Sequence, residues 1–403
     1  MTSSPPHSIT YLARTNHRNT GRLFGIKQPD RFSHIYIIGK TGAGKSTLIE
    51  TMARQDIAAG HGLALIDPHG DLVVRIANAI PESRMKDVVY LNAPDPVQPY
   101  GYNPLRKVRR DRRSLAASGI IEVLRTTWDA RSWGARMEHV LRNALLALLD
   151  QDEAALSDVL RLLTDKTYRI SVGRSVHHPP VRDFWLKEYP QYSYRYRADA
   201  IAPIQNKIGA FLSDPLLYRI LTEPKQPISV RRIMDEGRIL LVNLAKGQLG
   251  DDTASLLGGL LVTTIGLAAF SRADTEESER KPFFLYVDEF QNFTTLSVAS
   301  MASELRKYRV GLTFAHQYLH QLEESVRHAV IGNAGTLISF RLGATDANFI
   351  AREIDPKFSR LDLLNLPNHD IYLKLMIDGT PSKSFSATTI TPLDREYKSL
   401  LMS

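Results

Sequence analysis

A glycine-rich segment with one lysine and one hydroxyl residue is the part of the sequence best suited to chemistry. Residues 39–46 read GKTGAGKS and match the pattern GxxxxGK[ST] in full. In this pattern, backbone N–H groups at the start of a helix surround phosphates, the lysine reaches the β- and γ-phosphates, and the hydroxyl group ligates Mg²⁺. We expect ATP to bind along this segment, at Gly39, Lys40, Thr41, Gly42, Ala43, Gly44, Lys45, Ser46 and Thr47.

Hydrolysis also needs a carboxylate at the end of a neighbouring strand, and residues 283–289 (FFLYVDE) supply two in succession. Asp288 is expected to hold Mg²⁺ together with Ser46. Glu289 is suited to act as the base that activates the attacking water, while Lys45 assists catalysis. An apolar run that ends in Asp-Glu can also simply cap a helix, but the P-loop upstream favours a hydrolytic site.

Other nucleotide chemistries fit the sequence less well. The only Asn-Lys dipeptide, in residues 206–209 (NKIG), lacks the aspartate usual in a guanine-reading motif. A small-molecule kinase would rarely need the long helical stretch that separates the P-loop from Asp288.

Four further residues lie where a γ-phosphate sensor could be placed. Gln317 follows an apolar stretch at 310–315, at the strand end where open α/β sheets bind ligands. Arg306, Arg309 and Arg341 could each complete the site of a neighbouring subunit. For all four residues, a solvated surface position is the alternative.

The order of apolar stretches predicts an α/β fold with a mostly parallel sheet. A buried strand at 34–38 (HIYII) is followed by the glycine-rich turn and a helix at 46–60. Residues 106–232 show helical periodicity only, so we expect an all-α domain inserted into an ATPase domain made of residues 1–105 and 233–403. Further strands are expected at 63–66, 88–91, 239–243, 283–287, 310–315, 336–340 and 371–376.

Composition sets the broad class of the protein. The 403 residues include no cysteine, which excludes disulfides and thiolate zinc sites, and the net charge of +8 permits a polyanionic partner. The first 25 residues hold no apolar run long enough for a signal peptide or an anchor. Residues 253–271 are uncharged over a length that could span a bilayer, but their hydroxyl and glycine content favours a helix buried in the α/β core.

Two segments could contact nucleic acid. Residues 106–113 (RKVRRDRR) carry six basic residues and could neutralise phosphates or form a solvated helix start. Residues 189–197 (YPQYSYRYR) could stack bases between tyrosines or pack those tyrosines against the rest of the protein.

Taken in order, the segments GKTGAGKST, ALIDPHGD, YNPL, YVDEFQNF, LRKYRVGLTFAHQ and GTLISFRLG resemble the FtsK/HerA superfamily of P-loop ATPases. The likeness is greatest to the soluble ATPase domains of type IV secretion coupling proteins, which drive conjugative DNA transfer. It implies a RecA-like (ASCE) ATPase with an all-α insertion, assembled as a hexameric ring with ATP between subunits and DNA in the centre.

The same resemblance assigns roles to particular residues. Arg306 matches the trans-acting arginine best and Arg341 second, while Gln317 matches the sensor glutamine. Asp67 matches an acidic position near the nucleotide.

The resemblance has departures. Coupling proteins carry N-terminal transmembrane helices, whereas the first strand that we expect here begins at His34 after a polar segment. We therefore expect a cytoplasmic protein whose membrane association, if any, comes from a partner. The leading hypothesis is an ATP-driven DNA translocase. Two alternatives stay open: a nucleotide-gated assembly module that recruits a relaxase or secretion-channel protein, and a motor for protein substrates.

Overall fold

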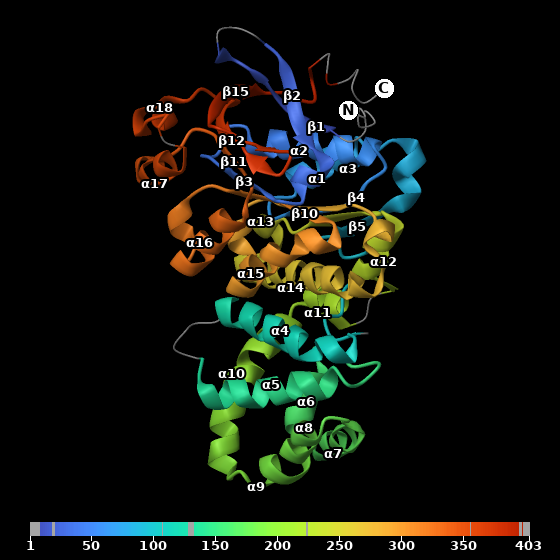
Figure 1. Ribbon diagram of the computed structural model, residues 1–403. Helices are drawn as coiled ribbons and strands as arrows, with labels where there is room; N and C mark the ends of the chain where they lie inside the picture. Colours follow the sequence, from blue (N-terminus) through green and yellow to red (C-terminus); the bar gives the residue numbers. More distant parts are fainter. Residues whose placement is uncertain are drawn as a thin grey trace. The chain divides into compact units, whose positions relative to one another are not determined.

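The computed structural model describes residues 9–17, 21–106, 108–127, 133–222, 225–354, 356–394 and 397. The chain forms two compact units (Figure 1). We call the first the sheet unit (Met1–Tyr90, Arg231–Leu244 and Arg272–Ser403) and the second the helical unit (Leu91–Val230 and Ala245–Ser271).

The sheet unit is built on one eleven-stranded sheet. From edge to edge its strands are β2 (Leu23–Lys27), β1 (Ile9–Thr15), β15 (Phe385–Thr389), β12 (Asp370–Lys374), β11 (Thr336–Ser339), β3 (Ile35–Ile38), β10 (Val310–His316), β9 (Phe283–Val287), β4 (Gly62–Asp67), β8 (Ile239–Asn243) and β5 (Val88–Asn92). The central strands from β11 to β8 pair in parallel. Strands β3, β4, β8, β9 and β10 are buried at every residue, as expected where helices cover both faces of a parallel sheet. The predicted α/β class with a parallel central sheet is confirmed.

Helices cover both faces of this sheet. On one face, α2 (Lys45–Ala58) buries Leu48, Ile49 and Met52 in the core that also contains Ile37 of β3 and Leu65 of β4. Figure 1 shows α15 (Leu296–Leu305) and α16 (Glu324–Asn333) on the opposite face. The remaining helices of this unit include α1 (Gln28–Arg31), α3 (Asp71–Ala77), α12 (Val230–Glu236), α17 (Ala344–Ile354) and α18 (Arg360–Asn365).

Strands β1, β2 and β15 are absent from the sequence-based prediction. They pair antiparallel beside β12 and extend the sheet on that side. The expectation that the first strand begins at His34 is therefore wrong, because β1 and β2 precede it. These strands bury only some of their residues, and segments such as FSATT in β15 are too polar to be recognised by their apolar content.

The helical unit contains α4 (Arg113–Thr127), α5 (Ala135–Leu148), α6 (Asp158–Thr164), α7 (Lys166–Ser175), α8 (Pro179–Asp183), α9 (Tyr189–Gln191), α10 (Tyr194–Leu212), α11 (Pro215–Thr222), α13 (Lys246–Leu249) and α14 (Asp251–Ser271). It also holds the short parallel pair β6 (Tyr100–Gly101) and β7 (Gln226–Pro227). The unit is larger than the insertion expected at 106–232, since it also includes residues 91–105 and 245–271.

Helix α14 accounts for most of that difference. It packs against α4, where a Cβ on Gly119 would lie 2.5 Å from Thr263, and the backbone of Leu260 accepts a hydrogen bond from Tyr102. This helix is long and apolar enough to cross a membrane, but 78% of its apolar stretch is buried inside the protein, as is common for a core helix. We expected that core to be the α/β one, whereas α14 belongs to the helical unit.

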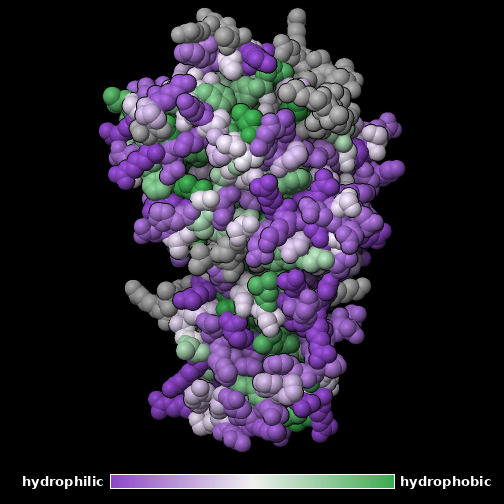
Figure 2. All heavy atoms as spheres, in the orientation of Figure 1, coloured by the Kyte–Doolittle hydropathy of each residue, from purple (hydrophilic) through white to green (hydrophobic). Residues whose placement is uncertain are grey.

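Among the described residues on the face shown in Figure 2, hydrophilic side chains predominate and hydrophobic ones occur in small groups. Scattered apolar groups of this kind are normal at a protein surface.

Candidate active site

The glycine-rich loop connects the end of β3 to the start of α2, as the motif requires. Gly42 and Gly44 have φ of 75° and 122°, in the region that side chains rarely adopt. A Cβ on Gly39 would lie 2.5 Å from the Cβ of Phe340 on the neighbouring chain segment. The Lys40 N–H donates to the Arg341 carbonyl at 2.9 Å, which fixes the loop to the residues that follow β11.

Lys45 lies inside this loop. Its Nζ donates to the carbonyls of Gly39 at 2.6 Å and Lys40 at 3.2 Å, and the side chain is buried. Burial lowers the pKa of Lys45, while the nearby carboxylates of Glu289 and Asp288 oppose that change. The ammonium group therefore lies inside the loop to which the motif assigns phosphate binding.

Asp288 follows β9 and meets the P-loop directly. The Ser46 hydroxyl, in the first turn of α2, donates to its Oδ2 at 2.9 Å. Asp288 is only 3% exposed, and burial raises its pKa to about 6, with further raising by Glu289 and Asp67. A hydroxyl and a buried carboxylate are ligands that Mg²⁺ accepts, and one carboxylate with substrate phosphates is its common arrangement in such sites. Ser46 and Asp288 therefore fit the predicted metal pair.

Glu289 is held by two glutamines. Its backbone is left-handed, with φ of 48°, and it is buried. One carboxylate oxygen accepts a hydrogen bond from Gln317 Nε2, and the other accepts from Gln291 Nε2 at 2.6 Å. The Thr41 hydroxyl donates to Gln317 Oε1 at 2.8 Å, so a continuous chain of hydrogen bonds joins the P-loop to Glu289. Gln291 is missing from the sequence-based set, because no motif assigns a role to that position.

Asp67 ends β4, next to β9, but its carboxylate serves local structure. Oδ1 accepts from the His69 N–H at 2.8 Å, and Oδ2 accepts from the N–H groups of Leu72 and Val73 at 2.9 and 3.1 Å. The N–H groups of Leu72 and Val73 are donors at the start of α3, so Asp67 caps that helix from outside it. Its contribution to the site is the negative charge beside Asp288.

The candidate arginines lie at opposite ends of the sheet. Arg306 precedes β10, whereas Gln317 follows it, and seven residues of strand span about 23 Å. Arg306 therefore cannot reach the P-loop of its own chain. Arg341 follows β11 beside the P-loop, and its side chain makes no hydrogen bond or ion pair with the residues that the structure describes. Arg309 lies in the turn of Arg306, with its guanidinium 6.0 Å from the Phe32 ring.

The basic segment at 106–113 is partly neutralised. Arg113 forms an ion pair with Asp150, and Arg109 pairs with Asp111 at 3.1 Å. Lys107 lies outside the described residues. Within the helical unit this segment precedes and begins α4, as a helix start would.

The tyrosines at 189–197 divide into two kinds. Tyr189 is 1% exposed and packs on Trp185 with a ring separation of 5.0 Å, and the Arg169 guanidinium lies 5.0 Å from its ring. Tyr194, by contrast, is 84% exposed. Packing therefore explains Tyr189, and Tyr194 is available for contact with another molecule.

Comparison with known proteins agrees with this geometry. The family model for the type IV secretion-system coupling protein DNA-binding domain matches residues 23–347. A comparison with curated protein sequences found no match.

Two solved proteins share the fold. The plasmid coupling protein TrwB in complex with the GTP analogue GDPNP has a TM-score of 0.66 at 17% identity, over 91% of this chain and 87% of that one. TrwB in complex with ADP and Mg²⁺ has a TM-score of 0.65 at 17% identity, over 91% of this chain and 88% of that one. VirB4 of Thermoanaerobacter pseudethanolicus has a TM-score of 0.67 at 14% identity, over 99% of this chain and 100% of that one.

The family match spans most of the chain and includes the P-loop, Asp288 and Gln317, while the structural likenesses place the fold among the RecA-like ATPases. The chain therefore belongs to the type IV secretion-system coupling protein DNA-binding domain family, within the FtsK/HerA-like P-loop ATPases.

Proposed function

We propose that this protein hydrolyses ATP and uses the energy to move DNA, as the motor of a type IV secretion-like transfer system. The observation that carries the proposal is the hydrogen-bond chain from Thr41 through Gln317 to Glu289. A site built only to hold nucleotide has no need for a buried carboxylate connected to the P-loop in this way. A base that must respond to the γ-phosphate does need such a connection.

The residues divide the reaction among them. Lys45 and the P-loop N–H groups hold the β- and γ-phosphates, and Mg²⁺ bound by Ser46 and Asp288 would neutralise charge on the phosphate oxygens. Glu289 accepts a proton from the water that attacks the γ-phosphorus, while the bond from that phosphorus to the ADP oxygen breaks. Gln317 orients Glu289 and senses, through Thr41, whether the γ-phosphate is present.

The position of Arg306 supports a ring in which each site is completed by a neighbour. Two hydrogen bonds hold the backbone of the turn that contains Arg306. Arg272 Nη1 donates to the Tyr308 carbonyl at 2.9 Å, and Arg280 Nη1 donates to the Lys307 carbonyl at 2.5 Å. The Arg306 guanidinium itself is exposed, and among the described residues it forms one hydrogen bond, to the Ser33 hydroxyl at 3.4 Å. A rigid turn with an exposed guanidinium is suited to act on a neighbouring subunit's γ-phosphate.

Two variants test the assignment of the site. Glu289→Gln should bind Mg–ATP with unchanged affinity and hydrolyse it at least 100-fold more slowly, because general base catalysis contributes about 10²- to 10⁴-fold. Normal turnover in this variant would exclude Glu289 as the base. Arg306→Ala and Lys45→Ala should each be inactive alone, and their mixture should regain activity because some interfaces combine one intact P-loop with one intact arginine.

DNA stimulation separates the motor from its alternatives. A motor should hydrolyse ATP several-fold faster with DNA, whereas a nucleotide-gated assembly module that recruits a relaxase or channel protein need not respond. A protein motor should respond to its polypeptide instead. TrwB has been solved with analogues of both GTP and ATP, so ATP and GTP should be compared in the same assay. We place the protein in the cytoplasm, with a partner supplying any membrane contact.

A further inference from the structure

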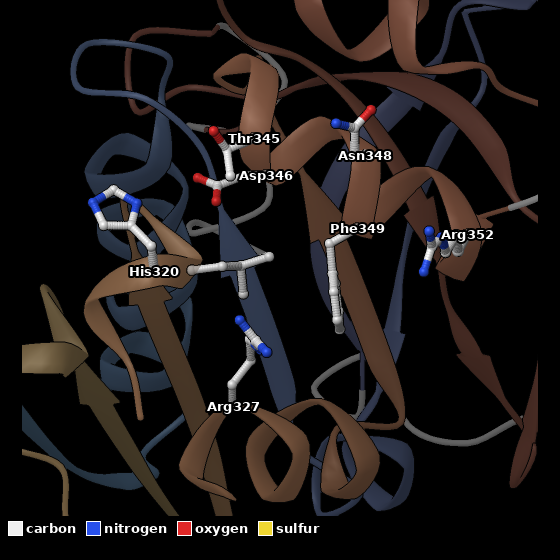
Figure 3. A pocket seen from close by; sticks show the side chains of 8 residues that line it. His320, Arg327, Thr345, Asp346, Asn348, Phe349 and Arg352 are labelled. Atoms are coloured by element: carbon white, nitrogen blue, oxygen red, sulfur yellow. The ribbon is translucent and has the colours of Figure 1, made fainter. Parts of the chain in front are cut away.

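A pocket beside the Gln317 loop has no part in the hydrolysis described above. Its volume is about 250 Å³. Figure 3 shows it between the residues that follow β10, the start of α16 and one face of α17. The pocket is lined by Leu319, His320, Arg327, Thr345, Asp346, Asn348, Phe349 and Arg352.

One carboxylate oxygen of Asp346, a residue that lines the pocket, lacks a hydrogen-bond donor among the described residues. It is 2% exposed, and its Oδ1 has no hydrogen-bond partner in the part of the chain that the structure describes. The carboxylate also receives the backbone N–H of Leu319, and burial raises its pKa. Buried polar atoms are almost always paired in folded proteins, so the unpartnered oxygen of this pocket-lining residue calls for a donor that the described residues do not supply.

The arginine and phenylalanine side chains that line the pocket favour a negatively charged ligand with an aromatic ring. Arg327 and Arg352 bring two guanidinium groups to the pocket, and Figure 3 shows them on different sides of it. Arg327 lies 5.2 Å from the centre of the Phe349 ring, and its contact with Glu324 is long, at 3.8 Å. Arginine and phenylalanine together provide stacking surface and positive charge, which is the combination used for bases and phosphates of single strands.

We propose that this pocket binds one unpaired nucleotide. The base stacks against Phe349 and donates an amine hydrogen to Asp346, while Arg327 and Arg352 receive the phosphate. A base in a duplex is stacked and paired on its edge, so only an unpaired nucleotide can present ring and amine together. Both a single DNA strand and a free mononucleotide have this chemistry. The assignment to a strand rests on the proposed function, in which DNA is the cargo.

The pocket is well placed to report occupancy to the ATPase site. Leu319 lines the pocket and is held by Asp346, and it lies two residues after Gln317. Gln317 in turn holds Glu289. A nucleotide that moves or stiffens the 317–320 segment would therefore alter how Glu289 is oriented, which gives DNA-dependent hydrolysis a physical route.

Binding can be measured separately from hydrolysis. The wild-type protein is saturated with ADP and Mg²⁺ to fill the P-loop, and a fluorescein-labelled single-stranded oligonucleotide is titrated by anisotropy. We expect Phe349→Ala and Arg352→Gln each to weaken this binding by about tenfold or more, in line with the loss of one stacked base or one phosphate contact. Arg352 is exposed, so its substitution should leave the fold intact. Arg174→Gln, at another pocket in α7, is the matched control and should bind as the wild type does.

Basal ATPase activity in both pocket variants should stay within about twofold of the wild type, and stimulation by single-stranded DNA should be lost. Unchanged oligonucleotide binding in both variants would overturn the inference. An equal loss of duplex binding would also overturn it, since it would indicate a general charge effect. Displacement of the strand by dAMP at equal nucleotide concentration would assign the pocket to a free nucleotide and overturn the strand assignment.

The two proposals can fail separately. If the variants lose strand binding but the wild type shows no stimulation, the motor proposal fails while the pocket stands. If the wild type is stimulated and the variants behave as it does, the pocket inference fails while the motor stands.

Discussion

Asp288→Asn should stabilise the metal-free protein, whereas Asp67→Asn should destabilise it. The two aspartates end the neighbouring parallel strands β9 and β4, and both are nearly inaccessible to solvent. They differ in their hydrogen-bond partners. Asp67 accepts three backbone N–H groups, while Asp288 accepts one from Ser46 and one from the Glu289 backbone, beside the Glu289 carboxylate.

The magnitude for Asp288 follows from its pKa. A folded-state value of about 6 against the ordinary 3.8 is a difference of about 2 pKa units. The unprotonated carboxylate therefore destabilises the folded state by about 3 kcal/mol above pH 6, and this penalty disappears as the pH falls towards 4. Asparagine removes the charge but cannot accept both existing hydrogen bonds, which costs about 1 kcal/mol. The expected net stabilisation is about 2 kcal/mol at pH 8.

For Asp67 the balance is reversed. Asparagine has one acceptor oxygen, so either the His69 N–H or the N–H groups of Leu72 and Val73 would face an amide N–H₂. Loss of a hydrogen bond to a charged group, together with loss of the negative charge near the start of α3, should cost about 1 to 3 kcal/mol.

Calorimetry in EDTA is the suitable assay. The two units can unfold separately, so the transition to follow is the one that shifts when ADP and Mg²⁺ are added. A change of 2 kcal/mol should move it by about 4 to 8 °C. The reasoning is refuted if Asp288→Asn lowers this transition at pH 8, or if its effect is the same at pH 8 and pH 4.

Three further outcomes are expected. Gly39→Ala should destabilise the P-loop and raise the Kd for ATP at least tenfold, because its Cβ would meet Phe340; an equilibrium titration with a fluorescent ATP analogue measures this. Gln317→Ala should lower turnover by about 10- to 100-fold with ATP affinity unchanged, because Glu289 loses its orienting partner, and a steady-state ATPase assay checks it. Burial lowers the pKa of His34 to about 4, so between pH 6.5 and 4 the unfolded chain binds more protons than the folded one. The free energy of unfolding should therefore fall by up to about 3 kcal/mol as the pH drops through this range. His34→Gln should make the free energy of unfolding, measured with urea, less dependent on pH there.

The sequence by itself determined the P-loop and the positions of the central strands along the chain. Glycine, lysine and serine at fixed spacing have a physical reason to occur together, and strands buried on both faces are apolar at every position. That is why β3, β4, β8, β9 and β10 are predictable. Asp288 and Glu289 followed because a carboxylate after such a strand faces the same edge of the sheet.

Only the tertiary structure decided how the remaining polar residues are used. Asp67 and Asp288 both follow apolar strands, yet one caps α3 and the other meets Ser46, because the turn after each strand differs. The contact of Gln317 with Glu289 joins residues 28 apart, and the Asp346 pocket joins three segments, so neither has a local pattern. Antiparallel β1, β2 and β15 are only partly buried, and their pairing with segments far away in the sequence, rather than their composition, makes them strands.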